Sequence, residues 1–144
     1  MISSREVIPS SLEHALIANR VLAALASGDL ASQEAQDAVD DGLQFLTSVL
    51  EGSQLATSRS VQIDSYGAAL AYGEGVKAFE LVGYQPGQND DPRPYLQELM
   101  NCASALREHP GPNEKATNDL KNFFKAIRDI ALANTERAVE RVSW

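Results

Sequence analysis

Residues 15–26 read ALIANRVLAALA, and this stretch decides the fold class. Alanine and leucine dominate it, both have high helix propensity, and neither glycine nor proline interrupts the run. Its apolar side chains cover nearly every direction around a helix axis, which is typical of a helix buried on most sides. We therefore predict a helix over Leu12–Ser27 that is central or shared with a second subunit. Ser10 and Glu13 have the spacing of a capping box at its start, and Gly28 closes it.

Apolar residues recur at helical spacing in four later segments, each bounded by capping or helix-breaking residues. Residues 53–64 separate two of these segments and are either a loop or the first turns of the helix that follows. The last segment, at about 30 residues, predicts a helix of roughly 45 Å that extends beyond the others. The four predicted helices are Gln33–Glu51, Ser65–Val82, Pro92–Glu108 and Asn113–Val142.

The pattern predicts an all-α fold: one domain over residues 1–144, with four or five mostly antiparallel helices and a long C-terminal helix. We expect the helices over 12–27 and 65–82 to lie inside, and those over 33–51 and 92–108 to cover them. The predicted core residues are Leu16, Leu22, Leu25, Val39, Leu46, Val76, Phe79, Leu99, Leu120, Phe123, Phe124 and Ile127.

Three glycines lie inside the predicted helix over 65–82. Each of them, Gly67, Gly73 and Gly75, costs about 1 kcal/mol relative to alanine in a helix interior. We expect a close approach of a neighbouring helix to offset this cost.

The chain is acidic, and the acid is concentrated in its first half. The formal net charge is -8, and residues 1–72 carry 3 basic and 9 acidic side chains. DNA, RNA and anionic lipid repel such a chain unless its basic residues converge on one patch, so we expect no nucleic-acid partner. The basic residues of the last helix are interrupted by Asp129, Glu136 and Glu140.

The expected cellular location of the protein and the state of its cysteine follow from features that the sequence lacks. No apolar stretch approaches the roughly 20 residues needed to span a membrane, and the first residues lack the features of a signal peptide. Cys102 is the only cysteine, which excludes an intramolecular disulfide. We expect a cytoplasmic protein without a membrane partner.

The densest group of acids is Glu34, Asp37, Asp40 and Asp41. Three of them, Glu34, Asp37 and Asp41, share one side of the predicted helix at spacings of three and four, opposite its apolar stripe. We interpret the group as a solvated face or as a patch that binds a protein partner. Carboxylates at this spacing also bind Mg²⁺ together with phosphate, but a second pair would be needed, from Glu136 and Glu140 or from Asp90 and Asp91.

No combination of residues points to catalysis. His14 and His109 lie in different elements without a second ligand at helical spacing, and Cys102 has no nearby base in its own helix. We therefore name no catalytic residue and no metal ligand, and we expect no cofactor.

Three functions remain open. The first is a non-enzymatic interaction or regulatory protein, homodimeric because the apolar helix surface exceeds what one core needs. The second is an acidic inhibitor or immunity-type protein that masks a basic site on its partner. The third is a metal-dependent enzyme that acts on nucleotides.

Overall fold

The structure is a computed structural model that describes the backbone of residues 4–27, 30–57, 66–82, 93–109 and 113–142. It describes the side chains of residues 11–27, 30–52, 71–82, 94–109 and 113–140. The described residues form five helices and no strand, which confirms the predicted all-α bundle. The helices are α1 (Ser4–Ser27), α2 (Gln33–Thr57), α3 (Tyr66–Leu81), α4 (Arg93–Glu108) and α5 (Glu114–Val142).

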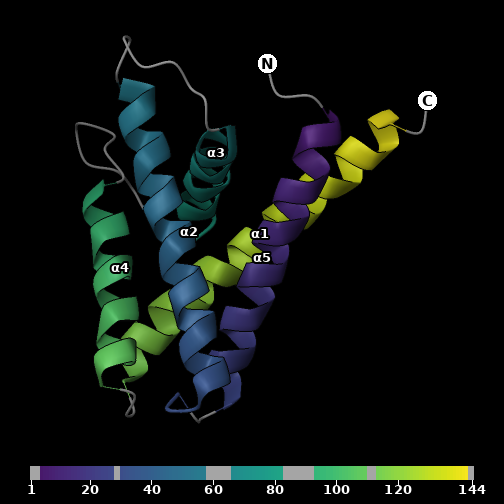
Figure 1. Cartoon of the computed structure of the whole chain (residues 1–144). Helices are drawn as coiled ribbons and strands as arrows, with labels where there is room; N and C mark the ends of the chain where they lie inside the picture. The colour runs from purple at the N-terminus through teal and green to yellow at the C-terminus, as the bar shows by residue number, and fades with distance from the viewer. Residues whose placement is uncertain (1–3, 28–29, 58–65, 83–92, 110–112, 143–144) are drawn as a thin grey trace.

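α1, α2, α3 and α5 have equally many helix neighbours in the described structure, and α4 has fewer. Figure 1 shows α2 and α4 antiparallel and side by side, with α3 behind α2 and with α5 crossing behind α1. α2 contacts α1, α3 and α4, and α5 contacts the same three helices. Among the described residues, α1 contacts α2, α3 and α5, and α3 contacts α1, α2 and α5, whereas α4 contacts α2 and α5. The helix over 33–51, which was predicted to cover the helices over 12–27 and 65–82, is therefore as central as they are, whereas the helix over 92–108 lies outside as predicted.

Gly42 explains why α2 is buried more deeply than an ordinary amphipathic surface helix. A Cβ atom added at Gly42 would lie 2.9 Å from Val21 Cγ2 and 3.2 Å from Phe124 Cζ. The ring of Phe45, one turn further along α2, lies 6.1 Å from that of Phe124 between centroids. Because glycine leaves this space open, side chains of α1 and α5 both reach the surface of α2.

The core lies where the five helices converge, and its largest fully buried side chains include Phe123, Phe124, Leu46 and Leu96. The predicted core is confirmed except at three positions. Leu22 and Val76 are half-buried, and Leu16 is 53% exposed. Leu16 was expected inside because α1 is apolar all round, but only the sides of α1 that meet α2, α3 and α5 are covered.

Two predicted helix boundaries are wrong. α1 begins at Ser4, so Ser10 lies inside the helix and is not its N-terminal cap. α2 continues through the buried Gly52 to Thr57, so residues 53–57 are neither a loop nor part of the next helix. Tertiary context overrides local stop signals of this kind. Side-chain caps begin α2 and α5, because Ser32 Oγ accepts from Ala35 N at 3.2 Å and Asn113 Oδ1 accepts from Ala116 N at 3.1 Å.

α5 is the longest of the described helices, and its C-terminal part leaves the group formed by α2, α3 and α4. Figure 1 shows the first turns of α1 beside the last turns of α5, away from those three helices. Ala138 near the end of α5 is buried, so the projecting part of α5 is covered on one side. Among the residues that the structure describes, no helix has the length and apolarity to cross a membrane.

Candidate functional site

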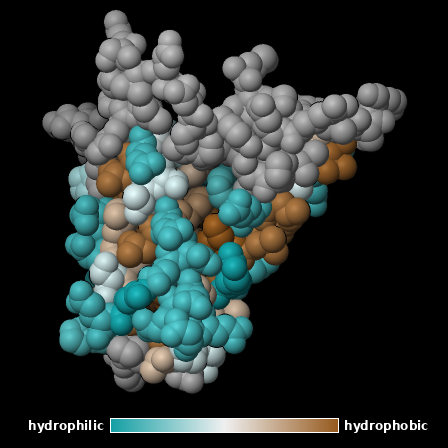
Figure 2. Space-filling model, viewed as in Figure 1, coloured by the Kyte–Doolittle hydropathy of each residue, from teal (hydrophilic) through white to brown (hydrophobic). Residues whose placement is uncertain are grey.

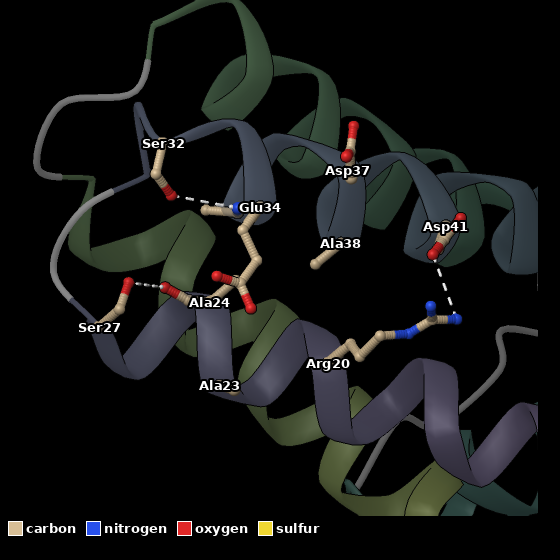
Figure 3. A pocket seen from close by; sticks show the side chains of 10 residues that line it. Arg20, Ala23, Ala24, Ser27, Ser32, Glu34, Asp37, Ala38 and Asp41 are labelled. Atoms are coloured by element: carbon tan, nitrogen blue, oxygen red, sulfur yellow. Dashed lines mark hydrogen bonds and ion pairs between the residues drawn. The ribbon is translucent and has the colours of Figure 1, made fainter.

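Three of the four acidic residues singled out from the sequence line a pocket between the end of α1 and the start of α2. Figure 3 shows Glu34 and Asp41 turned from α2 toward α1, Asp37 turned the other way, and Arg20 of α1 reaching toward Asp41. The pocket has a volume of about 400 Å³. Its floor consists of small side chains, and the residues that line it are Arg20, Ala23, Ala24, Ser27, Ser32, Glu34, Ala35, Asp37, Ala38 and Asp41.

Three of the four carboxylates have different partners. Arg20 Nη2 lies 3.2 Å from Asp41 Oδ2 across the pocket, and Gln33 Nε2 donates to Asp37 Oδ1 at 2.8 Å. Asp40 turns the other way and forms an ion pair with Arg107 of α4. Two of the four negative charges are thus paired with arginines, so the acidic patch is less dense than the sequence suggested.

Among the described residues, no second carboxylate pair of the kind that a metal site would need lies at this pocket. Glu136 lies near the end of α5, at the opposite end of the molecule from the start of α2 (Figure 1). Asp90 and Asp91 lie outside the described residues. In the part of the chain that is described, no group of three or more His, Cys, Asp or Glu residues could hold a metal ion.

A buried polar pair lies between α1 and α3. His14 Nδ1 and Glu74 Oε1 are 2.5 Å apart and share a hydrogen bond, although the two residues are 60 positions apart in the chain. The side chain of Glu74 is 1% exposed and that of His14 is 12% exposed. The ring of Phe45 meets the imidazole edge to face, with 5.0 Å between centroids.

Two buried oxygens next to this pair form no hydrogen bond. They are Glu74 Oε2 and Ser11 Oγ, and Ser11 is fully buried one turn before His14 on α1. Since Ser11 Oγ has no hydrogen-bond partner, His14 does not activate it as a base would activate a catalytic serine. The arrangement is a polar contact that joins α1 to α3, with the carboxylate of Glu74 buried and the imidazole of His14 mostly covered.

Sequence reasoning missed Glu74, although the sequence contained a signal. Glu74 occupies the same helical side as the buried Ala71 and Ala78, so it is a carboxylate on the core stripe of an apolar helix. Its neighbour Gly75 is buried, and a Cβ atom there would lie 2.9 Å from Val49 Cγ1 of α2. The expected close approach is therefore confirmed at Gly75 and wrong at Gly73, where nothing lies within 4 Å. The surroundings of Gly67 lie outside the described part of the structure.

Cys102 is buried on α4, as its place beside Met100 and Ala103 in the sequence indicated. Burial raises the pKa of the thiol, and the negative charge of Asp119 adds to this. A thiol whose pKa is raised is a poor nucleophile at neutral pH.

Large apolar side chains are exposed on one side of α1 and α5. Leu12 and Leu16 of α1 and Leu132 and Val139 of α5 are each between 40% and 53% exposed. We call these four residues the outer face. Figure 2 shows hydrophobic residues along the side of the molecule formed by these two helices.

Helical spacing places all four residues on the side turned away from α2 and α3. Leu132 follows Phe123 by nine residues, about 180° around a helix, and Phe123 packs against Phe79 of α3. Leu12 precedes Val21 by nine residues, again about 180°, and Val21 meets Gly42 of α2. α1 and α5 also make the most extensive helix–helix contact in the described chain, so the four residues lie on two neighbouring helices.

Comparison of the chain with protein families, with curated proteins and with solved structures finds no significant match.

Proposed function

We propose that this protein is a non-enzymatic interaction protein that forms a homodimer through the outer face of α1 and α5. The observation that carries the proposal is the exposure of Leu12, Leu16, Leu132 and Val139 on two helices that pack extensively against each other. Exposed apolar side chains are ordinary when they are scattered singly, whereas a contiguous group with polar residues around it marks a binding surface.

A stable dimer needs an interface of a known minimum area. A specific interface buries roughly 800 Å² on each partner. That is about a tenth of the 8588 Å² that the chain exposes. Burial of leucine and valine against a second copy would supply the driving force, at about 25 cal/mol for each Å² of apolar surface.

The other two functions have less support. The inhibitor hypothesis needs a dense acidic patch, but Asp40 and Asp41 are paired with Arg107 and Arg20. The metal-dependent enzyme needs a second carboxylate pair opposite Glu34, and the described residues do not provide one. Both hypotheses stay predictions.

Size-exclusion chromatography with light scattering at micromolar concentration tests the proposal. We expect a dimer for the native chain and a monomer for Leu16→Ser/Leu132→Ser, which removes apolar surface from both helices. Leu81→Ser is the matched control, because Leu81 is 67% exposed but lies at the end of α3, outside the outer face. A native chain that is monomeric throughout, or a control that dissociates as readily as the double variant, would contradict the proposal.

A further inference from the structure

The geometry of α5 points to the arrangement of the two copies, and this inference rests on the proposed function. We infer that the α5 helices of the two subunits pack antiparallel across a two-fold axis at Leu132. Each Arg128 then faces Glu136 of the partner subunit. The partner is a second copy of this chain, and the surface is the outer face with the charged residues that flank it.

The charges along α5 change sign at Leu132. Lys125 and Arg128 precede Leu132 on this side of the helix, and Glu136 follows it, with Val139 one turn further. Arg128 and Glu136 are each four residues from Leu132, so they lie at equal distances along the axis in opposite directions. Four residues correspond to about 40° beyond a full turn, so the two side chains also flank Leu132 symmetrically around the helix.

A two-fold axis through Leu132 uses this symmetry. A residue that lies a given number of positions before Leu132 in one subunit then lies at the height of the residue that lies the same number of positions after Leu132 in the partner. Arg128 and Glu136 of the partner subunit then lie at the same height, one on each side of the seam between the two α5 helices, so their side chains meet across it, and the pair occurs twice. Lys125 meets Val139 of the partner subunit, and its methylene stem can cover that apolar side chain while the ammonium group stays in water.

A parallel arrangement would bring identical residues together. Arg128 would then face its own copy, and so would Glu136, and each of these like-charge contacts would oppose association. The charge pattern therefore selects the antiparallel arrangement, although the apolar residues alone would allow both.

The side chain of Arg128 is suited to such a contact. Its Nε lies 3.3 Å from Oδ1 of the adjacent Asp129. A guanidinium group carries five N–H donors, so the terminal nitrogens can bind a second carboxylate while Nε keeps the first. Arg128 is about one-third exposed and Glu136 is exposed, so neither is already enclosed by its own subunit.

A charge-reversal series tests the arrangement by equilibrium sedimentation. We expect Arg128→Glu and Glu136→Arg each to weaken dimerisation about tenfold or more, because each places two like-charge pairs in the interface. The double variant Arg128→Glu/Glu136→Arg restores opposite charges and should return to within about threefold of the native dissociation constant. Lys77→Glu is the control, since it changes the net charge by the same amount on an exposed position of α3.

A cross-linking experiment gives a second measurement. In a Cys102→Ser background, Leu132→Cys should form a covalent dimer with a short bis-maleimide, whereas Gln97→Cys on the exposed side of α4 should not. The inference is overturned if Arg128→Glu leaves the native dimer intact, if the double variant stays dissociated, or if Leu132→Cys fails to cross-link. In each of these cases the native chain is still a dimer, whereas a monomeric native chain would overturn the proposed function itself.

Discussion

His14 of α1 and Glu74 of α3 meet through a 2.5 Å contact between Nδ1 and Oε1 in the interior of the bundle. The contact is a link between two helices that otherwise touch only lightly, since α1 packs mainly against α5 and α2. Removal of one member of a buried pair leaves the other without compensation, whereas replacement of both by apolar residues of similar size is close to neutral.

A double-mutant cycle should show this asymmetry. We expect His14→Leu to lower the free energy of unfolding by about 3–5 kcal/mol, and His14→Leu/Glu74→Met to recover most of that loss. Urea unfolding monitored by circular dichroism gives both values. Arg20→Leu is the control, because the pair that Arg20 forms with Asp41 is largely exposed and should contribute less than about 1 kcal/mol. Additive losses from the two single changes would contradict the interpretation of a coupled pair.

Two glycines of α3, separated by one residue, should respond to alanine in opposite directions. At Gly75 the new Cβ would lie 2.9 Å from Val49 Cγ1, and the stiff, buried valine cannot move aside, so we expect a loss of about 1–3 kcal/mol in stability. At Gly73 nothing lies within 4 Å, so the higher helix propensity of alanine should add up to about 1 kcal/mol. Thermal unfolding of the two variants checks the prediction, and equal effects at both positions would refute it.

Cys102 should react slowly with thiol reagents in the folded protein. Burial and the charge of Asp119 raise the pKa of the thiol, so less thiolate is present at a given pH than in an unfolded chain. The alkylation rate with iodoacetamide should therefore keep rising with pH beyond the range in which an ordinary cysteine levels off. The same sample in urea provides the reference rate. A native rate equal to the rate in urea would show that the thiol is accessible and that its pKa is ordinary.

Divalent cations should leave the protein unchanged. The pocket that holds Glu34 and Asp41 also contains the guanidinium of Arg20, which already neutralises part of the acid there. We expect Mg²⁺ or Mn²⁺, with or without a nucleotide, to shift the melting temperature by less than about 1 °C, because a ligand stabilises only the state that binds it. A clear, saturable rise that Asp41→Asn abolishes would revive the metal-dependent enzyme as the function of this pocket.

Local patterns in the amino-acid sequence predicted the fold class and most of the core. Apolar residues at a period of 3.6 and caps such as Ser32 are local features, and they predicted five helices and the burial of Leu46, Phe123 and Ile127. The oversupply of apolar surface on the first helix and the length of the last one also pointed to these elements as the candidates for self-association.

Which sides of the helices meet depends on contacts that local patterns do not predict. Gly42 admits Val21 and Phe124, which makes α2 a central helix, and this depends on contacts between residues far apart in the chain. The same is true of the His14–Glu74 pair, because nothing local assigns a partner across 60 positions. Periodicity fixes the angle of each side chain around its own axis, whereas the neighbour at that angle depends on how the loops and the packed side chains orient the helices.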